Sequence, residues 1–276
     1  MPSITISIIQ TNLHWEDKNA NLDMLSKKIE SITEKTEVVI LPEMFSTGFS
    51  MKPESLAEKM DGETISWMKR IAAEKKIILT GSVMIDPSTE AQDPSIPIAI
   101  GTQDKKYYNR LIWMLPNGEY GIYDKRHLFA YGNEHTHYSP GNKRLIASVK
   151  GWKINLQVCY DLRFPVWARQ AAEMEYDILI YVANWPEKRS LAWKTLLQAR
   201  AIENQCYVIG VNRVGQDGND IHYSGDSMII DAQGEILYQK KNEEDIFTYT
   251  LQKEKIIQVR EKYPFWKDAD SFIINC

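Results

Sequence analysis

Short, almost wholly apolar runs constrain the fold of this chain more than any other sequence feature. In EVVILPE (37–43), Val, Ile and Leu follow one another without alternation until Pro42 ends the run. This pattern is typical of a strand that is covered on both faces. Comparable runs are KIILTGSVMI (76–85), KINLQVCYD (153–161), DILIYVANWP (177–186) and CYVIGVNRVG (206–215). The sequence therefore predicts several buried strands with helices packed against them.

Helical patterns separate these strands. After the strand-like ITISIIQTN (4–12), apolar residues recur at helical spacing from Leu22 to Ile32. Further helices are predicted around residues 64–76, from about Pro165 to Glu173, and over 191–205. Two hairpins are also predicted, at the Asn117-Gly118 turn and at Gln233-Gly234. Strand–helix–strand units and hairpins thus share one α/β chain.

The chain has 276 residues and contains no repeat, low-complexity stretch or linker that would divide it. The segment from Pro87 to Pro97 is rich in loop-forming residues but too short for an interdomain tether. We therefore predict a single domain over 1–276, with a core over about 4–250 and a C-terminal extension over about 251–276.

Composition and net charge indicate which kind of molecule the protein binds. With 43% hydrophobic and 25% charged residues, the chain resembles an ordinary globular protein. A formal net charge of -4 provides no general attraction to nucleic acid or to an anionic membrane. No apolar run approaches the roughly 20 residues that span a bilayer, and the polar start MPSITISIIQTN lacks a secretory pattern. We expect a small-molecule substrate and a cytoplasmic location.

Three cysteines, Cys159, Cys206 and Cys276, form neither a metal-binding motif nor an even disulfide framework. Cys206 begins an apolar strand and is interpreted as a packing residue, and no catalytic argument applies to the terminal Cys276. Cys159 differs, because it directly follows a buried strand and precedes a predicted helix. This position exposes a nucleophile at the sheet edge and favours the thiolate, whereas the alternative is a buried structural cysteine.

Glu43 and Lys125 occupy comparable positions. Glu43 ends the run EVVILPE, so its carboxylate should emerge at the same sheet edge as Cys159 if the two strands are parallel, where it would suit a general acid and base. Lys125 follows a strand-like run, and its positive charge could stabilise the oxyanion that develops during acyl transfer. Taken singly, Glu43 could be a surface or capping residue and Lys125 part of a charged loop.

These three motifs together resemble the nitrilase, or carbon-nitrogen hydrolase, superfamily. LPEMF (41–45), DKRHLF (124–129) and VCYDLRFP (158–165) match the contexts of its catalytic Glu, Lys and Cys in the same order. The likeness continues through ANWPEKRSLAW, LLQARAIENQCYV, NRVG and SGDSMIIDAQG, and so covers the chain from residue 4 to about 265. It looks closest to the omega-amidase branch, whose members hydrolyse the terminal amide of dicarboxylic acid monoamides, including 2-oxoglutaramate.

The resemblance implies a four-layer α-β-β-α sandwich, usually paired into dimers through helices and C-terminal segments. It also implies that Glu134, in YGNEHTHYSPG, orients Lys125 and the substrate nitrogen. We expect Glu43 to move protons between Cys159, the leaving amine and water through a thioester intermediate. Lys125 and the backbone N–H of Tyr160 would form the oxyanion site.

No metal or cofactor is expected. A site made of Cys159, His127 and Glu43 would lack paired ligand spacing, and the pair His135 and His137 is interpreted as part of a polar loop.

Substrate recognition is less constrained by the sequence. Arg189 is the candidate for binding a substrate carboxylate, with a helix-start surface arginine as the alternative. Trp185 is a candidate pocket wall or a core residue. Arg163 is expected to pair locally and is not assigned to substrate, and Arg200 and Glu203 are predicted to form a structural ion pair one helical turn apart.

Two other functions remain open. A nitrile or N-carbamoyl hydrolase would use the same Glu-Lys-Cys triad with a differently shaped pocket. A catalytically silent binding scaffold would keep the fold but lose at least one member of the triad.

Overall fold

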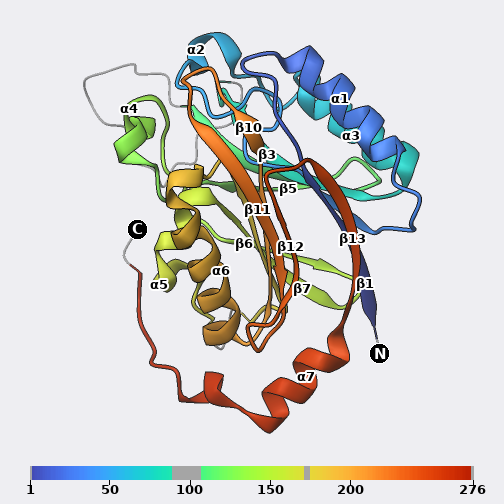
Figure 1. Ribbon diagram of the computed structural model, residues 1–276, viewed down its shortest axis with the longest axis vertical. Helices are drawn as coiled ribbons and strands as arrows, with labels where there is room; N and C mark the ends of the chain where they lie inside the picture. Colours follow the sequence, from blue (N-terminus) through green and yellow to red (C-terminus); the bar gives the residue numbers. More distant parts are fainter. Residues whose placement is uncertain (1, 89–106, 171–174, 275–276) are drawn as a thin grey trace.

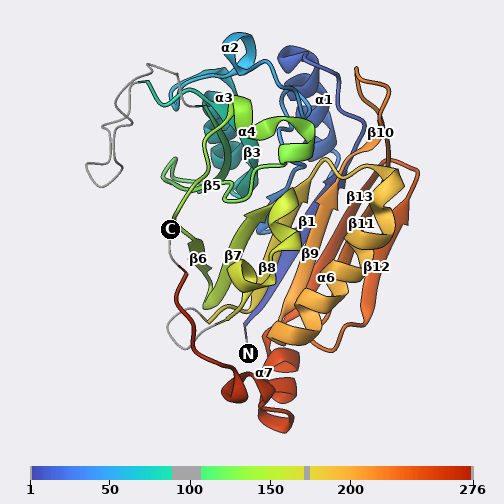
Figure 2. The ribbon, with the colours of Figure 1, turned by 90° about the vertical axis from the view of Figure 1, so that its left-hand side faces the viewer.

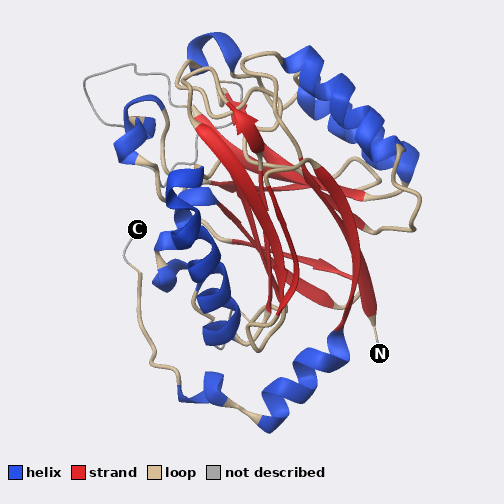
Figure 3. Ribbon diagram, viewed as in Figure 1, coloured by secondary structure: helices blue, strands red, loops and turns tan. Residues whose placement is uncertain are grey.

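Two β-sheets packed face to face form the centre of the computed structural model, which describes residues 2–88, 107–170 and 175–274 (Figure 1). Helices cover the outer face of each sheet, and colouring by secondary structure makes these layers plain (Figure 3). This arrangement confirms the predicted α/β fold with two sheets between helical layers.

The first sheet has six strands in the order β13-β1-β2-β3-β4-β5. Its central strands β1, β2 and β3 are parallel to one another, and its remaining strands pair antiparallel. The bounds are β1 (Ser3–Gln10), β2 (Val38–Ile40), β3 (Ile78–Ile85), β4 (Tyr108–Met114), β5 (Tyr120–Asp124) and β13 (Asp245–Gln252).

The second sheet follows the order β10-β11-β9-β8-β7-β6, with β12 also paired to β11. Its central strands β7, β8 and β9 are again parallel, and the outer pairs are antiparallel. The bounds are β6 (Leu145–Val149), β7 (Trp152–Val158), β8 (Ile178–Ala183), β9 (Tyr207–Asn212), β10 (Val214–Gln216), β11 (His222–Ile230) and β12 (Ile236–Lys241).

The longer helices lie outside the sheets, with α1 and α3 against the first sheet and α6 against the second (Figures 1 and 2). The α-helices are α1 (Lys18–Glu30), α2 (Pro53–Leu56), α3 (Glu63–Lys75), α4 (Glu134–His137), α5 (Pro165–Ala168), α6 (Ser190–Asn204) and α7 (Lys253–Lys262). Short 3₁₀ helices are η1 (Ala130–Gly132), η2 (Cys159–Arg163), η3 (Glu187–Arg189) and η4 (Phe265–Asp268).

Alternation along β2 explains why its apolar run is continuous. Val38 and Ile40 belong to the core between the sheets, whereas Val39 packs into the core beneath α1 and α3. Because successive side chains of a strand point to opposite faces, both faces of β2 must be apolar. The run EVVILPE is therefore the signature of a central strand.

The predicted hairpins are confirmed. The β4–β5 turn is closed by hydrogen bonds from Leu115 N to Glu119 O and from Gly118 N to Leu115 O, 2.8 and 3.0 Å long. In the β11–β12 turn, Asp231 N donates to Glu235 O over 2.9 Å. Both turns place a glycine at positive φ, as the sequence indicated.

One predicted helix is shorter than expected. The helix expected from Pro165 to Glu173 ends at Ala168, because Arg169 leaves the helical region with φ -60° and ψ 129°. Residues 171–173 lie outside the described part of the chain, as do residues 89–97 of the loop predicted between Pro87 and Pro97. Within the described residues, no helix is long and apolar enough to cross a membrane.

Candidate active site

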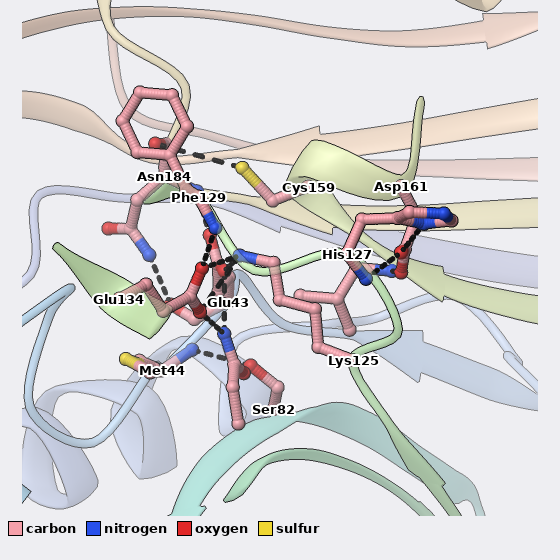
Figure 4. A network of polar contacts seen from close by, with 12 residues as sticks. Glu43, Met44, Ser82, Lys125, His127, Phe129, Glu134, Cys159, Asp161 and Asn184 are labelled. Atoms are coloured by element: carbon pink, nitrogen blue, oxygen red, sulfur yellow. Dashed lines mark hydrogen bonds and ion pairs between the residues drawn. The ribbon is translucent and has the colours of Figure 1, made fainter. Parts of the chain in front are cut away.

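Three strand ends bring Glu43, Lys125 and Cys159 to one place between the sheets (Figure 4). Glu43 lies just beyond β2, Lys125 directly follows β5, and Cys159 directly follows β7. Glu43 and Lys125 are fully buried, and Cys159 is 8% exposed. All three residues therefore belong to a buried site.

Lys125 is held by two buried carboxylates. Its Nζ lies 2.9 Å from Glu43 Oε1, and 3.0 and 2.9 Å from the two carboxylate oxygens of Glu134. Burial alone would lower the pKa of Lys125, but the charges of Glu134 and Glu43 outweigh it and raise the pKa above its ordinary value. The ammonium group is therefore charged at neutral pH.

Glu134 begins α4, and the preceding Asn133 has a φ of 60°. The Glu134 Oε2 atom also accepts the Phe129 N–H over 2.6 Å. Burial, opposed by Lys125 and reinforced by Glu43, raises the pKa of Glu134. The structure thus places Glu134 where the sequence resemblance predicted, in contact with Lys125.

Two asparagines that the sequence interpretation missed also hold Glu43. Asn109 Nδ2 donates to Glu43 Oε1 over 2.8 Å, and the backbone N–H of Asn184 donates to Glu43 Oε2 over 2.8 Å. Asn184 Nδ2 further donates to the backbone oxygen of Glu43 over 2.6 Å. Asn184 directly follows β8, so the strand-end argument used for Glu43 could have identified it, but nothing in the local sequence marks Asn109.

Cys159 begins η2 with a φ of 45°, a left-handed conformation that costs a non-glycine residue energy. Its Sγ lies 4.0 Å from the backbone oxygen of Asn184. Burial, followed by the charge of Glu43, raises the pKa of the Cys159 thiol well above its ordinary value despite the opposing effect of Lys125.

The prediction that the position of Cys159 favours the thiolate was therefore wrong. The helix that Cys159 begins is a 3₁₀ helix of only five residues, and burial is the largest influence on the pKa of its thiol. The resting nucleophile is a thiol, so attack requires a base that takes its proton.

Asp161, a second residue of the nucleophile turn, ties that turn to the lysine loop. Its Oδ2 accepts the Val158 N–H over 3.0 Å and the Tyr123 hydroxyl over 2.7 Å. Its Oδ1 accepts the His127 N–H over 2.9 Å and lies 2.8 Å from His127 Nδ1. These bonds flank both Cys159 and Lys125, and the sequence interpretation did not single out Asp161.

The remaining predicted site residues lie beside this cluster. The Arg189 guanidinium carbon lies 5.2 Å from the centre of the Phe129 ring, and that of Arg163 lies 4.9 Å from the Trp185 ring. Trp185 is 3% exposed and donates its indole N–H to Arg189 O over 2.8 Å. Tyr160, half-buried, is the second residue of η2.

Three residues outside the site have the structural roles predicted for them. Arg200 Nη1 lies 3.0 Å from Glu203 Oε1, which confirms the ion pair. Cys206 is fully buried in the hydrophobic core. Cys276 lies outside the described residues.

Among the described residues, His135 and His137 do not belong to a group of side chains that could bind a metal ion. His137 Nδ1 lies 4.0 Å from a Glu54 carboxylate oxygen, and both His135 and His137 belong to α4. Across the described part of the chain, no group of three or more His, Cys, Asp or Glu residues could hold a metal ion.

Comparisons with known proteins agree with this geometry. The sequence model of the carbon-nitrogen hydrolase family matches residues 5–261. The chain is 42% identical to omega-amidase YafV of Escherichia coli K12, over 99% of each chain. It is 30% identical to a 2-oxoglutaramate amidase of Bacillus subtilis, over 96% of each chain. A crystal structure of a CN-hydrolase superfamily protein from Xanthomonas campestris, with an arsenic adduct in its active site, superposes with a TM-score of 0.90 at 41% identity over the whole of both chains.

Proposed function

The chain belongs to the carbon-nitrogen hydrolase family and is an amidase of that family, and we propose that it hydrolyses the terminal amide of small dicarboxylic acid monoamides such as 2-oxoglutaramate. We assign Glu43, Lys125 and Cys159 as its catalytic residues. The observation that carries this assignment is the buried cluster in which Lys125 Nζ lies 2.9 Å from both Glu43 and Glu134, beside the Cys159 thiol.

The first half of the reaction forms a thioester. Glu43 accepts the proton of the Cys159 thiol as the sulfur attacks the amide carbon, and the carbonyl oxygen becomes an oxyanion. Lys125 and the backbone N–H of Tyr160 stabilise that oxyanion. The tetrahedral intermediate collapses as Glu43 returns its proton to the nitrogen, so ammonia leaves and the acyl group stays on sulfur.

The second half regenerates the enzyme. Glu43, again ionised, takes a proton from water, and the resulting hydroxide attacks the thioester carbonyl. The second tetrahedral intermediate collapses by breaking the carbon–sulfur bond, and the proton held by Glu43 returns to the thiolate. The products are the carboxylic acid and a neutral Cys159 thiol. Throughout, Glu134 keeps Lys125 charged and oriented.

Glu43 is needed as a base because the thiol is protonated at rest. Burial raises the pKa of Cys159, so few sulfurs are ionised at neutral pH without proton transfer. An amide also needs a proton on its leaving nitrogen, and a buried carboxylate that has just taken the thiol proton can supply it.

For substrate selection we propose Arg189 as the group that binds the distal carboxylate, with Trp185 as an apolar wall. Arg189 is half-buried, stacks on Phe129 and shares a hydrogen bond with the Trp185 indole through its backbone oxygen. The backbone N–H of Phe129 in turn donates a hydrogen bond to Glu134. Phe129 therefore contacts both the Arg189 guanidinium and a member of the catalytic cluster. A guanidinium held on an aromatic face is well suited to a carboxylate.

The test is ammonia release across a panel of amides, nitriles and N-carbamoyl amino acids. We expect rapid hydrolysis of 2-oxoglutaramate and succinamate, and much slower release from neutral amides of the same length. A neutral amide, a nitrile or a carbamoyl compound turned over faster than both monoamides would overturn the proposed specificity.

The role of Arg189 has its own test. Arg189→Met should raise KM for the anionic amides about 10-fold while leaving KM for a neutral amide within about twofold. Arg163→Met is the matched comparison, since Arg163 also stacks on an aromatic ring of this region. If Arg163→Met raised KM for anionic amides alone and Arg189→Met did not, Arg163 and not Arg189 would be the residue that binds the carboxylate.

We also propose a cytoplasmic homodimer with one catalytic domain over about 4–250. The exposed apolar side chains of Leu191 and Ile202 on α6, and of Phe265 and Ile273 after α7, support dimer contacts through helices and the 251–276 extension. Free cysteines 159 and 206 suit a reducing compartment. Light scattering of the full chain should give twice the monomer mass, and a monomeric mass at micromolar concentration would refute the dimer.

A further inference from the structure

Asn109 lies at the centre of the charged cluster without carrying a charge. It is the second residue of β4 and is fully buried. Its side-chain Nδ2 donates to Glu43 Oε1 over 2.8 Å and to Glu134 Oε1 over 3.1 Å. Its backbone oxygen accepts the Lys125 N–H over 3.0 Å. One residue therefore contacts the carboxylates of Glu43 and Glu134 through its side chain and the backbone of Lys125 through its own backbone.

The electrostatics of the cluster explain why a neutral donor matters there. Glu43 and Glu134 place two acidic side chains against the single ammonium group of Lys125, and like charges in a buried site repel one another. Each Oε1 atom accepts a bond from Lys125 Nζ and another from Asn109 Nδ2. The amide thus bridges the carboxylates a second time and leaves the charge of the cluster unchanged.

The orientation of the Asn109 amide follows from the same contacts. If the amide were flipped, its oxygen would face two carboxylate oxygens, so the nitrogen must point toward them. Within the described residues, Asn109 Oδ1 then has no hydrogen-bond partner although it is buried. An unsatisfied buried acceptor costs free energy, which the two charge-assisted bonds made by the nitrogen offset.

These bonds also distinguish the two oxygens of Glu43. A carboxylate oxygen accepts about two hydrogen bonds in its plane. Oε1 already accepts two, from Lys125 and Asn109, whereas Oε2 accepts one from a described residue, the Asn184 N–H. Oε2 therefore keeps an open lone pair.

We propose that Asn109 is a positioning residue that saturates Glu43 Oε1 and holds the carboxylate so that Oε2 is the oxygen that exchanges protons with Cys159, the leaving nitrogen and water. This inference rests on the proposed function, because it assigns an atom to the proton transfers of that reaction. Charged side chains could not replace the amide. An aspartate would add a third negative charge, and a lysine or arginine would neutralise the base.

The variants Asn109→Ala and Asn109→Asp test the proposal, with Asn117→Ala and Asn117→Asp as matched controls. Asn117 lies in the exposed β4–β5 turn of the same hairpin, and among the described residues its side chain bonds to Glu119. Asn109→Ala should lower kcat about 10- to 100-fold, as expected for loss of a hydrogen bond to a charged group, and leave KM within about threefold. The Asn117 variants should match the wild type.

The pH profile separates a positioning role from a general loss of structure. The Asn109 amide bonds two acidic groups, Glu43 and Glu134, and Lys125 bonds both of them. Cys159 and Tyr138 interact with the same carboxylates through charge. Removing a donor to the carboxylates should move the acid limb of the kcat/KM profile to higher pH, and Asn109→Asp should move it further, by about one pH unit. An unchanged acid limb in both variants, or an effect confined to KM, would overturn the proposal.

Alkylation of Cys159 by iodoacetamide gives a readout that needs no substrate, with Cys159→Ala as the background. We expect alkylation near neutral pH to be about 10-fold slower in Asn109→Ala than in the wild type, because the base is misplaced. If the wild type is alkylated normally but hydrolyses no amide, the proposed function fails while the Asn109 inference is still judged by this rate. If Asn109→Ala does not fold, Asn109→Ser, which keeps a polar group too short to reach both carboxylates, replaces it, and equal alkylation rates would overturn the inference.

Discussion

The two sheets share one plan but contribute different chemistry to the site. Each has three parallel central strands, β1-β2-β3 in the first and β7-β8-β9 in the second, flanked by antiparallel ones. The first sheet and its loops supply every charged member of the cluster, Glu43, Lys125 and Glu134. The second supplies two neutral groups, the Cys159 thiol and the Asn184 amide.

This difference shows how a buried reaction centre can be assembled from two similar halves. The ion-pair cluster and its Asn109 bridge lie wholly within residues 43–134, so the acid–base apparatus is built on one sheet. The nucleophile belongs to the other sheet. Hydrogen bonds from Asn184 to Glu43 and between Asp161 and His127 join the two halves of the site, and we call these bonds the joint between the sheets. Activity therefore depends on how the sheets pack against each other. Removing one partner of the buried ion pairs, in contrast, should also cost stability.

Removing the nucleophile should separate these roles most sharply. We expect Cys159→Ala to lower kcat at least about 10⁴-fold, as loss of a nucleophile does in other hydrolases. The temperature of unfolding should hardly change, because the substitution removes one neutral sulfur atom, keeps the same backbone requirement and leaves the ion pairs intact. Steady-state kinetics and calorimetry on the same preparation check both statements, and substantial activity in this variant would end the proposed mechanism.

Removing the positive charge should instead damage both activity and stability. Lys125→Met leaves two buried carboxylates without a counterion, and breaking a buried ion pair from one side typically costs about 3–5 kcal/mol. The loss of an oxyanion donor should lower kcat about 10²- to 10³-fold.

The double variant Lys125→Met/Glu134→Gln is the control for the charge imbalance. It removes one charge of each sign, so denaturant unfolding should show recovery of a large part of the lost stability, whereas kcat should stay low. Recovery of activity together with stability would mean that Lys125 serves the fold rather than the reaction.

Alkaline pH should lower the free energy of unfolding through the Cys159 thiol, which belongs to the second sheet. Burial raises the pKa of Cys159, so the folded chain keeps a proton that the unfolded chain loses above about pH 8.5. The unfolded state then binds fewer protons, and the contribution of this thiol to stability falls by about 1.4 kcal/mol per pH unit in that range. Below pH 8.5 the thiol is protonated in both states and contributes no pH dependence.

Comparison with Cys159→Ala isolates this effect, because Cys206, whose pKa burial also raises, is present in both proteins. From pH 8.5 to 9.5, the wild type should lose about 1 kcal/mol of unfolding free energy relative to the variant. Parallel stability curves over that range would show that the Cys159 thiol ionises as readily in the folded chain as in the unfolded one.

The joint between the sheets should give the smallest effect. Asn184→Ala removes the side-chain bond to Glu43 O but keeps the backbone N–H that reaches Glu43 Oε2. We expect about a 10-fold fall in kcat and a loss of about 1 kcal/mol of stability, the usual contribution of one hydrogen bond. An effect as large as that of Lys125→Met would mean that the joint, and not the charged half, limits the reaction.

Local sequence patterns predicted most of the strands because burial on both faces leaves a direct trace. Val38, Val39 and Ile40 must all be apolar, whichever face each meets. The same patterns placed Glu43, Lys125 and Cys159 at strand ends, and the resemblance added Glu134. The helix after Pro165 was predicted too long, because apolar spacing continued past Ala168 although the backbone turned out of the helix there.

What the sequence by itself determined was therefore the strand-and-helix pattern, the family likeness and the residue types that can break a carbon–nitrogen bond. The tertiary structure alone decided which groups surround them. Asn109, Asn184 and Asp161 contact partners 66, 141 and 34 residues away. The thiol that its strand end suggested would ionise readily is instead buried and protonated, because desolvation depends on the packing of two sheets, which no local stretch of sequence encodes.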